Sequence, residues 1–245
     1  MIVSTKGIVL KAINYKDTSK IVEVFTESDG VVALIAKGVR KQTKVFGVLE
    51  PLNIIHLSFY KKTTQDLFLL SKAETISSYQ QLLNTQITLI VGLAILELVK
   101  YTQVHNNPNK YIYNLTINCI ETLKSKSISP YLIMIYFFIQ LTKDLGIDVI
   151  EKIIEYKYKN FDYICFNTIN GEIKVALGKG NFPKISKNTV DLLILVNELD
   201  LSTLKTIEII SINFKELIVF FEYYISFYLG KTIKINILYL FDNVV

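Results

Sequence analysis

The first 76 residues alternate apolar and polar positions with the two-residue period of a β-strand. Asp29-Gly30 predicts a tight hairpin turn between two of these segments, because glycine tolerates the positive φ that a primed turn requires. The longest connection falls between the third and fourth segments. Five strands in about 75 residues, connected in this way, predict a five-stranded Greek-key barrel. The expected strands are Ile8–Ile13, Lys20–Thr26, Val31–Ala36, Asn53–Tyr60 and Leu67–Lys72.

From about Ser78 the hydrophobic period lengthens to that of a helix, as in the spacing of Leu89, Leu93 and Leu96. Ser129-Pro130 predicts a helix start, with serine as the N-cap and proline at the first helical position. Gly146 predicts the end of that helix. Three further helices are expected at Tyr111–Leu123, Val190–Leu199 and Phe214–Leu229.

The stretch from about residue 156 to residue 187 fits neither period and is expected to form a hairpin and loops inserted among the helices. No repeat or flexible linker is evident. The sequence therefore predicts an α+β protein, with a barrel domain at residues 1–77 and a mainly helical domain at residues 78–245.

Composition raises the question of a membrane, because 51% of the residues are hydrophobic and the mean hydropathy is +0.36. The longest charge-free stretches, Thr75–Leu96 and Ser127–Thr142, do not supply the roughly 20 predominantly apolar residues of a spanning helix. The N-terminus shows no secretory signal, and two cysteines fit a reducing compartment. We therefore expect a cytoplasmic protein with buried helices and no membrane partner.

The positive charge is concentrated in the first third of the chain. Residues 1–80 hold 11 basic and 7 acidic side chains, whereas residues 81–245 hold 16 and 15. A local excess of cations is what a polyanionic partner requires.

Residues suited to catalysis are sparse. The two histidines, His56 and His105, are far apart, and neither has a cysteine or carboxylate at metal-ligand or triad spacing. Glu151 and Glu155 lie one helical turn apart but are flanked by lysines, which favours a solvated face. The sequence therefore predicts a protein that is not an enzyme.

The connection between the third and fourth strands is the strongest candidate for a binding site. It contains no acidic residue from Gly30 to Leu49, while four cations fall within eight positions. Single-stranded nucleic acid requires cations for its phosphates and aromatic faces for its bases. A merely solvated loop explains the lysines about equally well, and many of the aromatic residues are expected in the core. The candidate DNA-binding residues are Lys37, Arg40, Lys41 and Lys44, with Lys11, Lys61 and Lys62 as second-rank members and Tyr15, Phe46, Phe59 and Tyr60 as candidate stacking residues.

These residues also resemble the bacterial RecO family of recombination mediators. The resemblance is most specific at Ala36-Lys37-Gly38-Val39-Arg40-Lys41, followed by Phe46-Gly47, Leu49 and Pro51. It is carried as well by Gly7-Ile-Val-Leu, Tyr15-Lys-Asp, Lys20-Ile-Val and Ala73-Glu74, and more weakly by Leu145-Gly146 and by Tyr224 through Gly230-Lys231.

The resemblance implies an oligonucleotide-binding (OB) barrel followed by a helical domain, without nucleotide hydrolysis. It implies a nucleoid-associated protein of DNA repair and recombination that binds single- and double-stranded DNA and anneals complementary strands. The implied partners are RecR, in some systems RecF, and the single-strand-binding protein (SSB) through its C-terminal tail. RecA is an indirect partner, since the family helps load it on SSB-coated strands.

One departure from the family concerns metal. Many members carry two C-x-x-C pairs in an insert after the Leu-Gly, whereas the insert here holds only Cys165. A structural zinc site requires about four ligands, so we expect no metal and no cofactor. Cys165 and Cys119 are expected to be ordinary buried thiols.

Two other functions remain open from the sequence. A generic OB-fold protein for single-stranded nucleic acid, unrelated to recombination, would share the basic loop. A purely structural interaction module would use the lysines only for solubility. The apolar helices are expected either to share a large core or to leave a groove for the SSB tail, rimmed by lysines such as Lys100, Lys110, Lys124 and Lys126.

Overall fold

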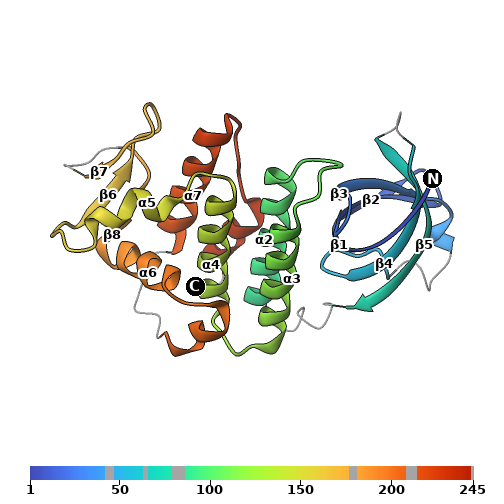
Figure 1. Ribbon diagram of the computed structural model, residues 1–245, viewed down its shortest axis with the longest axis horizontal. Helices are drawn as coiled ribbons and strands as arrows, with labels where there is room; N and C mark the ends of the chain where they lie inside the picture. The colour runs from blue at the N-terminus through green and yellow to red at the C-terminus, as the bar shows by residue number, and fades with distance from the viewer. Residues whose placement is uncertain (42–46, 63–65, 79–85, 177–180, 208–213, 244–245) are drawn as a thin grey trace. The chain divides into compact units, whose positions relative to one another are not determined.

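A computed structural model of the chain describes residues 1–41, 47–62, 66–78, 86–176, 181–207 and 214–243 (Figure 1). The chain forms two compact units, Met1–Lys124 and Ser125–Val245. The first unit contains the predicted barrel, and the second consists mainly of helices, so the predicted α+β class is confirmed. The first unit extends to Lys124, so it also contains the helices that follow the barrel, and the division at residue 77 stays a prediction. None of the helices in the described ranges is long and apolar enough to cross a membrane.

Five strands close into a barrel in the order β1-β2-β3-β5-β4 (Figure 1). All neighbours pair antiparallel except β3 and β5, which are parallel. This arrangement confirms the predicted five-stranded barrel, although β1 and β5 are longer than expected. The strands are β1 (Ile2–Tyr15), β2 (Ser19–Thr26), β3 (Gly30–Ala36), β4 (Ile54–Tyr60) and β5 (Leu67–Ser77).

The longest strand, β1, closes the barrel by pairing on both sides. Its first half pairs with β4 from Ile2 to Ile8, and its second half pairs with β2 from Gly7 to Tyr15. The register with β2 shifts between Val9 and Lys11. An extra residue at such a bulge reverses which side chains face outward. Accordingly, Ser4 and Lys6 are exposed before the bulge, whereas Lys11 and Ile13 are exposed after it.

The barrel interior is filled by aliphatic and aromatic side chains that alternate along the strands. Phe59 and Phe68 stack with ring centroids 5.5 Å apart, and both are buried. Val22, Val24 and Leu34 complete the same cluster from β2 and β3. The alternation that predicted the strands therefore also selects the core side of each strand.

The β2–β3 turn differs from the two-residue turn predicted at Asp29-Gly30. Thr26 pairs with Gly30, so three residues form the turn, and Gly30 adopts a φ of +68°. Three-residue hairpin loops require such a residue at their end. The Thr26 hydroxyl donates to the Gly30 carbonyl over 2.9 Å and accepts from the Asp29 N–H over 3.0 Å.

Two helices belong to the barrel's unit: α2 (Gln86–Thr102) and α3 (Lys110–Ser125). The Tyr113 ring meets the edge of Phe25 with centroids 5.7 Å apart. The Lys100 ammonium lies 2.9 Å from the Glu23 carboxylate on β2. These helices therefore cover part of the outer face of β2, and Lys100 is engaged there.

The second unit is built around α4 (Pro130–Asp144) and α7 (Phe214–Leu229), whose Phe138 and Phe221 rings stack 4.3 Å apart. Ser129 occupies the predicted N-cap position, but its side chain makes no capping hydrogen bond. Gly146 ends α4 with a φ of +70°. Two further helices are α5 (Val149–Ile153), which the sequence did not predict, and α6 (Lys187–Asn197).

The predicted insert forms a three-stranded sheet in the order β7-β6-β8. Its strands are β6 (Tyr163–Phe166), β7 (Ile173–Val175) and β8 (Lys184–Ser186). Phe166 anchors the sheet, because its buried ring contacts Phe220, Tyr224 and Phe227 of α7. The insert is thus fixed to the helices by aromatic packing.

The narrow space around Gly30 provides a test of how the β2–β3 turn packs against Asn107. A Cβ at Gly30 would lie 2.2 Å from the Asn107 carbonyl oxygen, whereas a Cβ at Gly38, which has a φ of +72°, meets nothing within 4 Å. Gly38→Ala should therefore lower the free energy of unfolding by about 1 kcal/mol through backbone strain alone. Gly30→Ala should lower it by about 1–3 kcal/mol more, because the chain must move away from the added methyl group. Urea unfolding followed by circular dichroism measures both variants, and equal losses would contradict this packing.

Candidate nucleic-acid interface

The β1–β2 turn gathers several of the predicted binding residues at one end of the barrel. The Arg40 Nη1 group donates to the Lys16 carbonyl over 3.1 Å, and the Arg40 backbone N–H donates to the Thr18 carbonyl over 3.1 Å. The Lys16 ammonium lies 5.4 Å from the centre of the Tyr15 ring. Lys37 is exposed just beyond the end of β3. We call Tyr15, Lys16, Lys37 and Arg40 the turn cluster.

The segment between β3 and β4, residues 37–53, is called the basic connection. It is anchored to the barrel on both sides of residues 42–46. Val39 and Leu49 are buried and belong to the barrel core. The Lys20 ammonium, whose side chain is 5% exposed, lies 2.6 Å from the Glu50 carboxylate. The Asn53 amide donates to the carbonyls of Gly47 over 2.8 Å and of Val48 over 3.2 Å. The ends of the connection are therefore held against the barrel by packing, an ion pair and hydrogen bonds.

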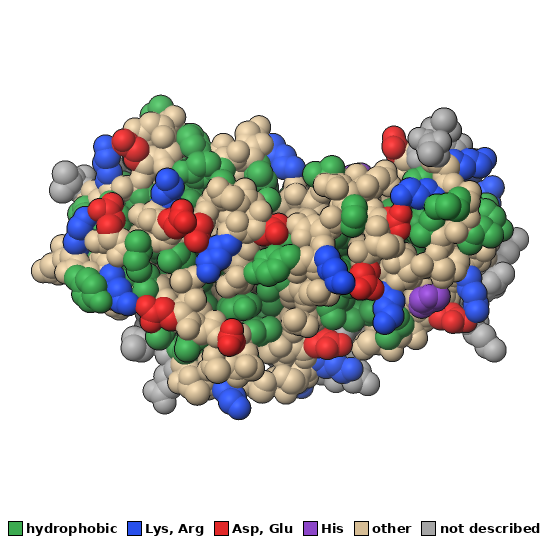
Figure 2. Space-filling model, in the orientation of Figure 1, with side chains coloured by type: hydrophobic (Ala, Val, Ile, Leu, Met, Phe, Trp, Pro, Cys, Tyr) green, Lys and Arg blue, Asp and Glu red, His purple; other side chains and the backbone are tan. Residues whose placement is uncertain are grey.

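An apolar row crosses the outside of four strands beside the turn cluster. Ile13 pairs with Ile21, Ile21 with Ile35, and Ile35 with Leu69. Directly paired residues point to the same face, so these four side chains form a continuous row. Ile13 is 45% exposed and Leu69 37% exposed, while Ile21 and Ile35 are half-buried. Figure 2 shows hydrophobic side chains among basic and acidic ones on the visible face of the barrel.

The apolar row and the turn cluster are contiguous. Tyr15 stands two residues after Ile13 on β1, and Lys37 stands two residues after Ile35. Lys11 is exposed two residues on the other side of Ile13. Lys37 therefore flanks the apolar row on the side of the turn cluster, and Lys11 lies on its other side, opposite Glu23 of β2.

Sequence reasoning missed the apolar row because an apolar residue in a strand is ordinarily assigned to the core. The sequence did contain a signal, namely which of the two alternating sets of residues on a strand faces the interior. On β2 the alternate set Val22 and Val24 already supplies the interior, which leaves Ile21 outside.

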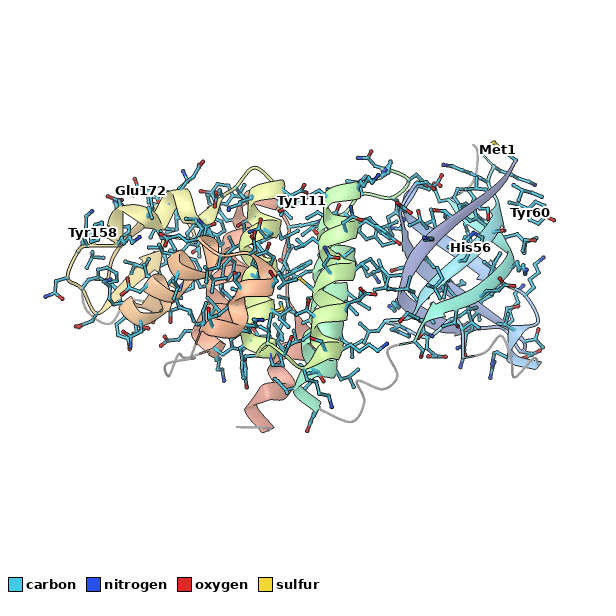
Figure 3. All side chains as sticks on the ribbon, turned by 60° about the horizontal axis from the view of Figure 1, so that its bottom comes forward. Met1, His56, Tyr60, Tyr111, Tyr158 and Glu172 are labelled. Atoms are coloured by element: carbon cyan, nitrogen blue, oxygen red, sulfur yellow. The ribbon has the colours of Figure 1, made fainter. Side chains whose placement is uncertain are left out.

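Lys61 and Lys62 lie apart from the turn cluster. The Lys61 ammonium pairs with the Asp29 carboxylate over 2.6 Å, and Asp29 belongs to the β2–β3 turn, at the opposite end of that hairpin from Lys37. Burial alone would raise the pKa of Asp29, but hydrogen bonds from Lys61 and Ser28 and the charge of Lys61 outweigh it and hold the pKa below its ordinary value. Tyr60 is 43% exposed at the same end as Lys61, beside Met1 (Figure 3).

Phe59 is not available for base stacking, because it is fully buried against Phe68. Lys44, Phe46 and the side chain of Lys41 lie outside the described residues. The predicted binding residues that the structure brings together are thus Tyr15, Lys37 and Arg40, with Lys11 nearby.

The Ser4 hydroxyl lies 3.3 Å from His56 Nε2, and the pairing of β4 with β5 places Glu74 beside His56. This order resembles a nucleophile, a base and an acid. Glu74, however, is paired with Lys72 over 2.7 Å, and His56 is exposed on the open barrel surface. The Ser4 hydroxyl also lies 3.1 Å from that of Ser58. A triad requires the acid to orient the base, and this surface does not provide that arrangement.

The structure also bears on metal binding. Across the described ranges, no three side chains of His, Cys, Asp or Glu gather in a group that could hold a metal ion. Cys119 is fully buried, and burial raises the pKa of its thiol. Cys165 is only half-buried, so the expectation of a buried thiol was wrong there.

Comparison with known proteins agrees with this architecture. Residues 1–79 match the family model described as recombination protein O N terminal. The DNA repair protein RecO of Salinibacter ruber is 32% identical over 147 residues, covering 60% of this chain and 56% of that protein. The DNA repair protein RecO of Prosthecochloris aestuarii is 32% identical over 149 residues, with the same coverage. In these two alignments the chain thus spans little more than half of the relative's length.

A third relative aligns over nearly the whole chain. The DNA repair protein RecO of Caldicellulosiruptor saccharolyticus is 27% identical over 237 residues, covering 95% of this chain and 96% of that protein. The family model covers the barrel, and this alignment continues through the helical unit. The barrel is therefore similar to the N-terminal domain of RecO proteins, and the similarity to this third relative extends through the helices.

Proposed function

We propose that this chain binds single-stranded DNA through its barrel and acts without catalysis in recombinational DNA repair. The observation that carries the proposal is the contiguity of the apolar row with flanking cations. Phosphates interact with cations, and bases pack on apolar or aromatic surfaces. The apolar row offers such a surface, and Tyr15 adds an aromatic ring that is 37% exposed.

The chemistry of this surface favours binding that is independent of base sequence. Isoleucine and leucine side chains cannot donate or accept hydrogen bonds, so they do not distinguish one base edge from another. Lys37 and Arg40 supply charge that every phosphate shares. A protein that accepts any strand suits a repair pathway that must act at arbitrary positions.

The relatives named DNA repair protein RecO support the pathway. By the resemblance to this family, we further propose that the chain anneals complementary strands, binds double-stranded DNA, and works with RecR and in some systems RecF. In this role it helps load RecA on SSB-coated strands. A generic protein for single-stranded nucleic acid, unrelated to recombination, is the alternative.

An annealing assay distinguishes a recombination mediator from a generic binder of single-stranded nucleic acid. A generic binder holds complementary strands apart, whereas a mediator brings them together. We expect the full chain to accelerate pairing of complementary oligonucleotides coated with SSB, and RecR to modify that rate. Loss of single-strand-specific fluorescence measures annealing. Tight strand binding combined with slower pairing than in protein-free controls would favour the alternative.

The cationic contacts can be tested through salt dependence. Replacing Lys37, Arg40, Lys41 and Lys44 with alanine should weaken single-strand binding. It should also flatten the plot of log affinity against log salt by about 0.7 per lost phosphate contact. Fluorescence anisotropy at several salt concentrations gives both quantities.

A matched control removes four exposed cations from the second unit, Lys152, Lys159, Lys205 and Lys231. This variant has the same net charge as the first and should retain the wild-type slope. If the two quadruple variants titrate alike, the basic connection is not the phosphate site.

The helical unit is proposed to bind the acidic, apolar-ended tail of SSB. Three aromatic side chains on α7 remain exposed: Tyr223 at 51%, and Phe227 and Tyr228 at 36% each. Exposed apolar groups of this kind are typical of partner sites. Of the lysines suggested for the rim, Lys126 belongs to this unit and is exposed, whereas Lys100, Lys110 and Lys124 belong to the barrel's unit.

Titrating a labelled SSB tail peptide into the full chain tests this site. We expect saturable binding that is weakened when Phe227 and Tyr223 are both replaced with serine. A peptide ending in serine instead of its apolar residue is the control and should bind poorly. Absence of binding at micromolar concentrations would contradict the proposal and leave the helical unit as a scaffold.

A further inference from the structure

A second exposed surface lies on the first half of β1 with β4 and β5. Three rows of paired residues cross these strands, and directly paired residues share a face. Ile2 pairs with Tyr60 and Tyr60 with Leu69, so this row continues the apolar row. The other two rows are polar: Ser4, Ser58 and Lys72, and Lys6, His56 and Glu74. We call Ser4, Lys6, His56, Ser58, Tyr60 and Lys72 the second face.

β4, the middle strand of the second face, is separated from β2 and β3 in both directions around the barrel. The strand order places β1 between β4 and β2, and β5 between β4 and β3. Outward side chains of a closed barrel radiate from its axis. Those of β4 therefore point away from those of β2 and β3, where the apolar row meets the turn cluster. In Figure 3, His56 and Tyr60 mark two points along β4.

The side chains of the second face suit a phosphate backbone with bases at its edge. Lys6 and His56 are exposed, and the ammonium of Lys72 is paired only with the exposed carboxylate of Glu74 among the ion pairs of the described residues. The side chains of Lys72 and Glu74 are 69% and 60% exposed, and an ion pair this exposed contributes little stability. A phosphate can therefore compete for Lys72. Ser4 and Ser58 supply hydroxyl donors 3.1 Å apart.

Tyr60 and Ile2 provide the apolar part of the second face. The Tyr60 ring is 43% exposed, and Ile2 beside it is 60% exposed. A tyrosine at the border of a cationic strand surface is suited to stack on a base. Ile2, Tyr60 and Leu69 continue the apolar row, so the apolar edge of the second face is connected with the row beside the turn cluster.

We propose that the second face binds a second single strand of nucleic acid, so that one barrel holds both strands to be paired. The inference rests on the proposed function, because joining two strands requires a surface for each. Its specific content is that both surfaces belong to one chain. The alternative occupant, a second copy of this chain, would join strands held by two separate barrels.

The triple variant Lys6→Ala, Tyr60→Ala, Lys72→Ala tests the second face. Each of these side chains is exposed, so the barrel core is left intact. The matched control replaces Lys152, Tyr158 and Lys205, which are exposed in the second unit, with alanine. Circular dichroism and urea unfolding establish that both variants fold as the wild type does.

Binding stoichiometry and annealing are then measured with an oligonucleotide of about 12 nucleotides, within the site size of one OB barrel. We expect two oligonucleotides per wild-type chain and one per triple variant. The affinity for the first oligonucleotide should be unchanged. The rate of annealing should fall about tenfold, because the loss of one stacking contact costs about 1.4 kcal/mol. The control should match the wild type in all three measurements.

One oligonucleotide per wild-type chain, or normal annealing by the triple variant, would overturn the second face. Wild-type protein that binds and anneals with one strand per chain, and whose dimerisation is lost in the triple variant, would assign the surface to a second copy. Wild-type protein that binds no strand at all would instead overturn the proposed function, and the second face with it.

Discussion

The pairing of β1 with two neighbours is the constraint on which the barrel's surfaces depend. A strand of 14 residues can pair with β4 through its first half and with β2 through its second only if it bends strongly. The register shift between Val9 and Lys11 provides the bend. The same shift reverses the outward parity, so that Lys6 and Lys11 both reach solvent although one is even-numbered and the other odd-numbered. Without this reversal, one half of β1 would direct its polar side chains into the core.

The basic connection illustrates how a charged segment is held by a small barrel. Isolated lysine ammonium groups are costly to bury, and the Lys20 side chain is 5% exposed. Glu50 compensates this charge over 2.6 Å, and it does so from the far end of the basic connection. Val39 and Leu49 add apolar contacts on each side. The connection therefore begins and ends at fixed points, which reduces the conformational entropy that a ligand must remove on binding.

Sequence periodicity predicted what depends on local pattern and missed what depends on register. It placed five strands and the main helices, since alternation and the 3.6-residue period are local properties. It began the first strand at Ile8, because residues 2–7 include Lys6 and Gly7, which are depleted in strands. It missed α5, whose five residues are too few to show a period. The exposed apolar row could not be found from one strand alone, because it exists only through the pairing of Ile21 with Ile35 and of Ile35 with Leu69.

In the candidate site as well, composition identified the types of residue, whereas only the geometry showed which of them lie together. Counting cations identified Lys37 and Arg40 but assigned Lys61 to the same surface as a second-rank member, because a count does not show where on the barrel each side chain lies. The ion pair with Asp29 places Lys61 at the other end of the β2–β3 hairpin, and Tyr60 lies with it. Rows of outward side chains run around a barrel from strand to strand. Here the row from Ile13 through Leu69 to Tyr60 extends from the turn cluster to the neighbourhood of Lys61, and none of its side chains is charged. An uncharged path of this kind attracts bases without fixing their order, while the cations at its borders determine where the phosphates lie.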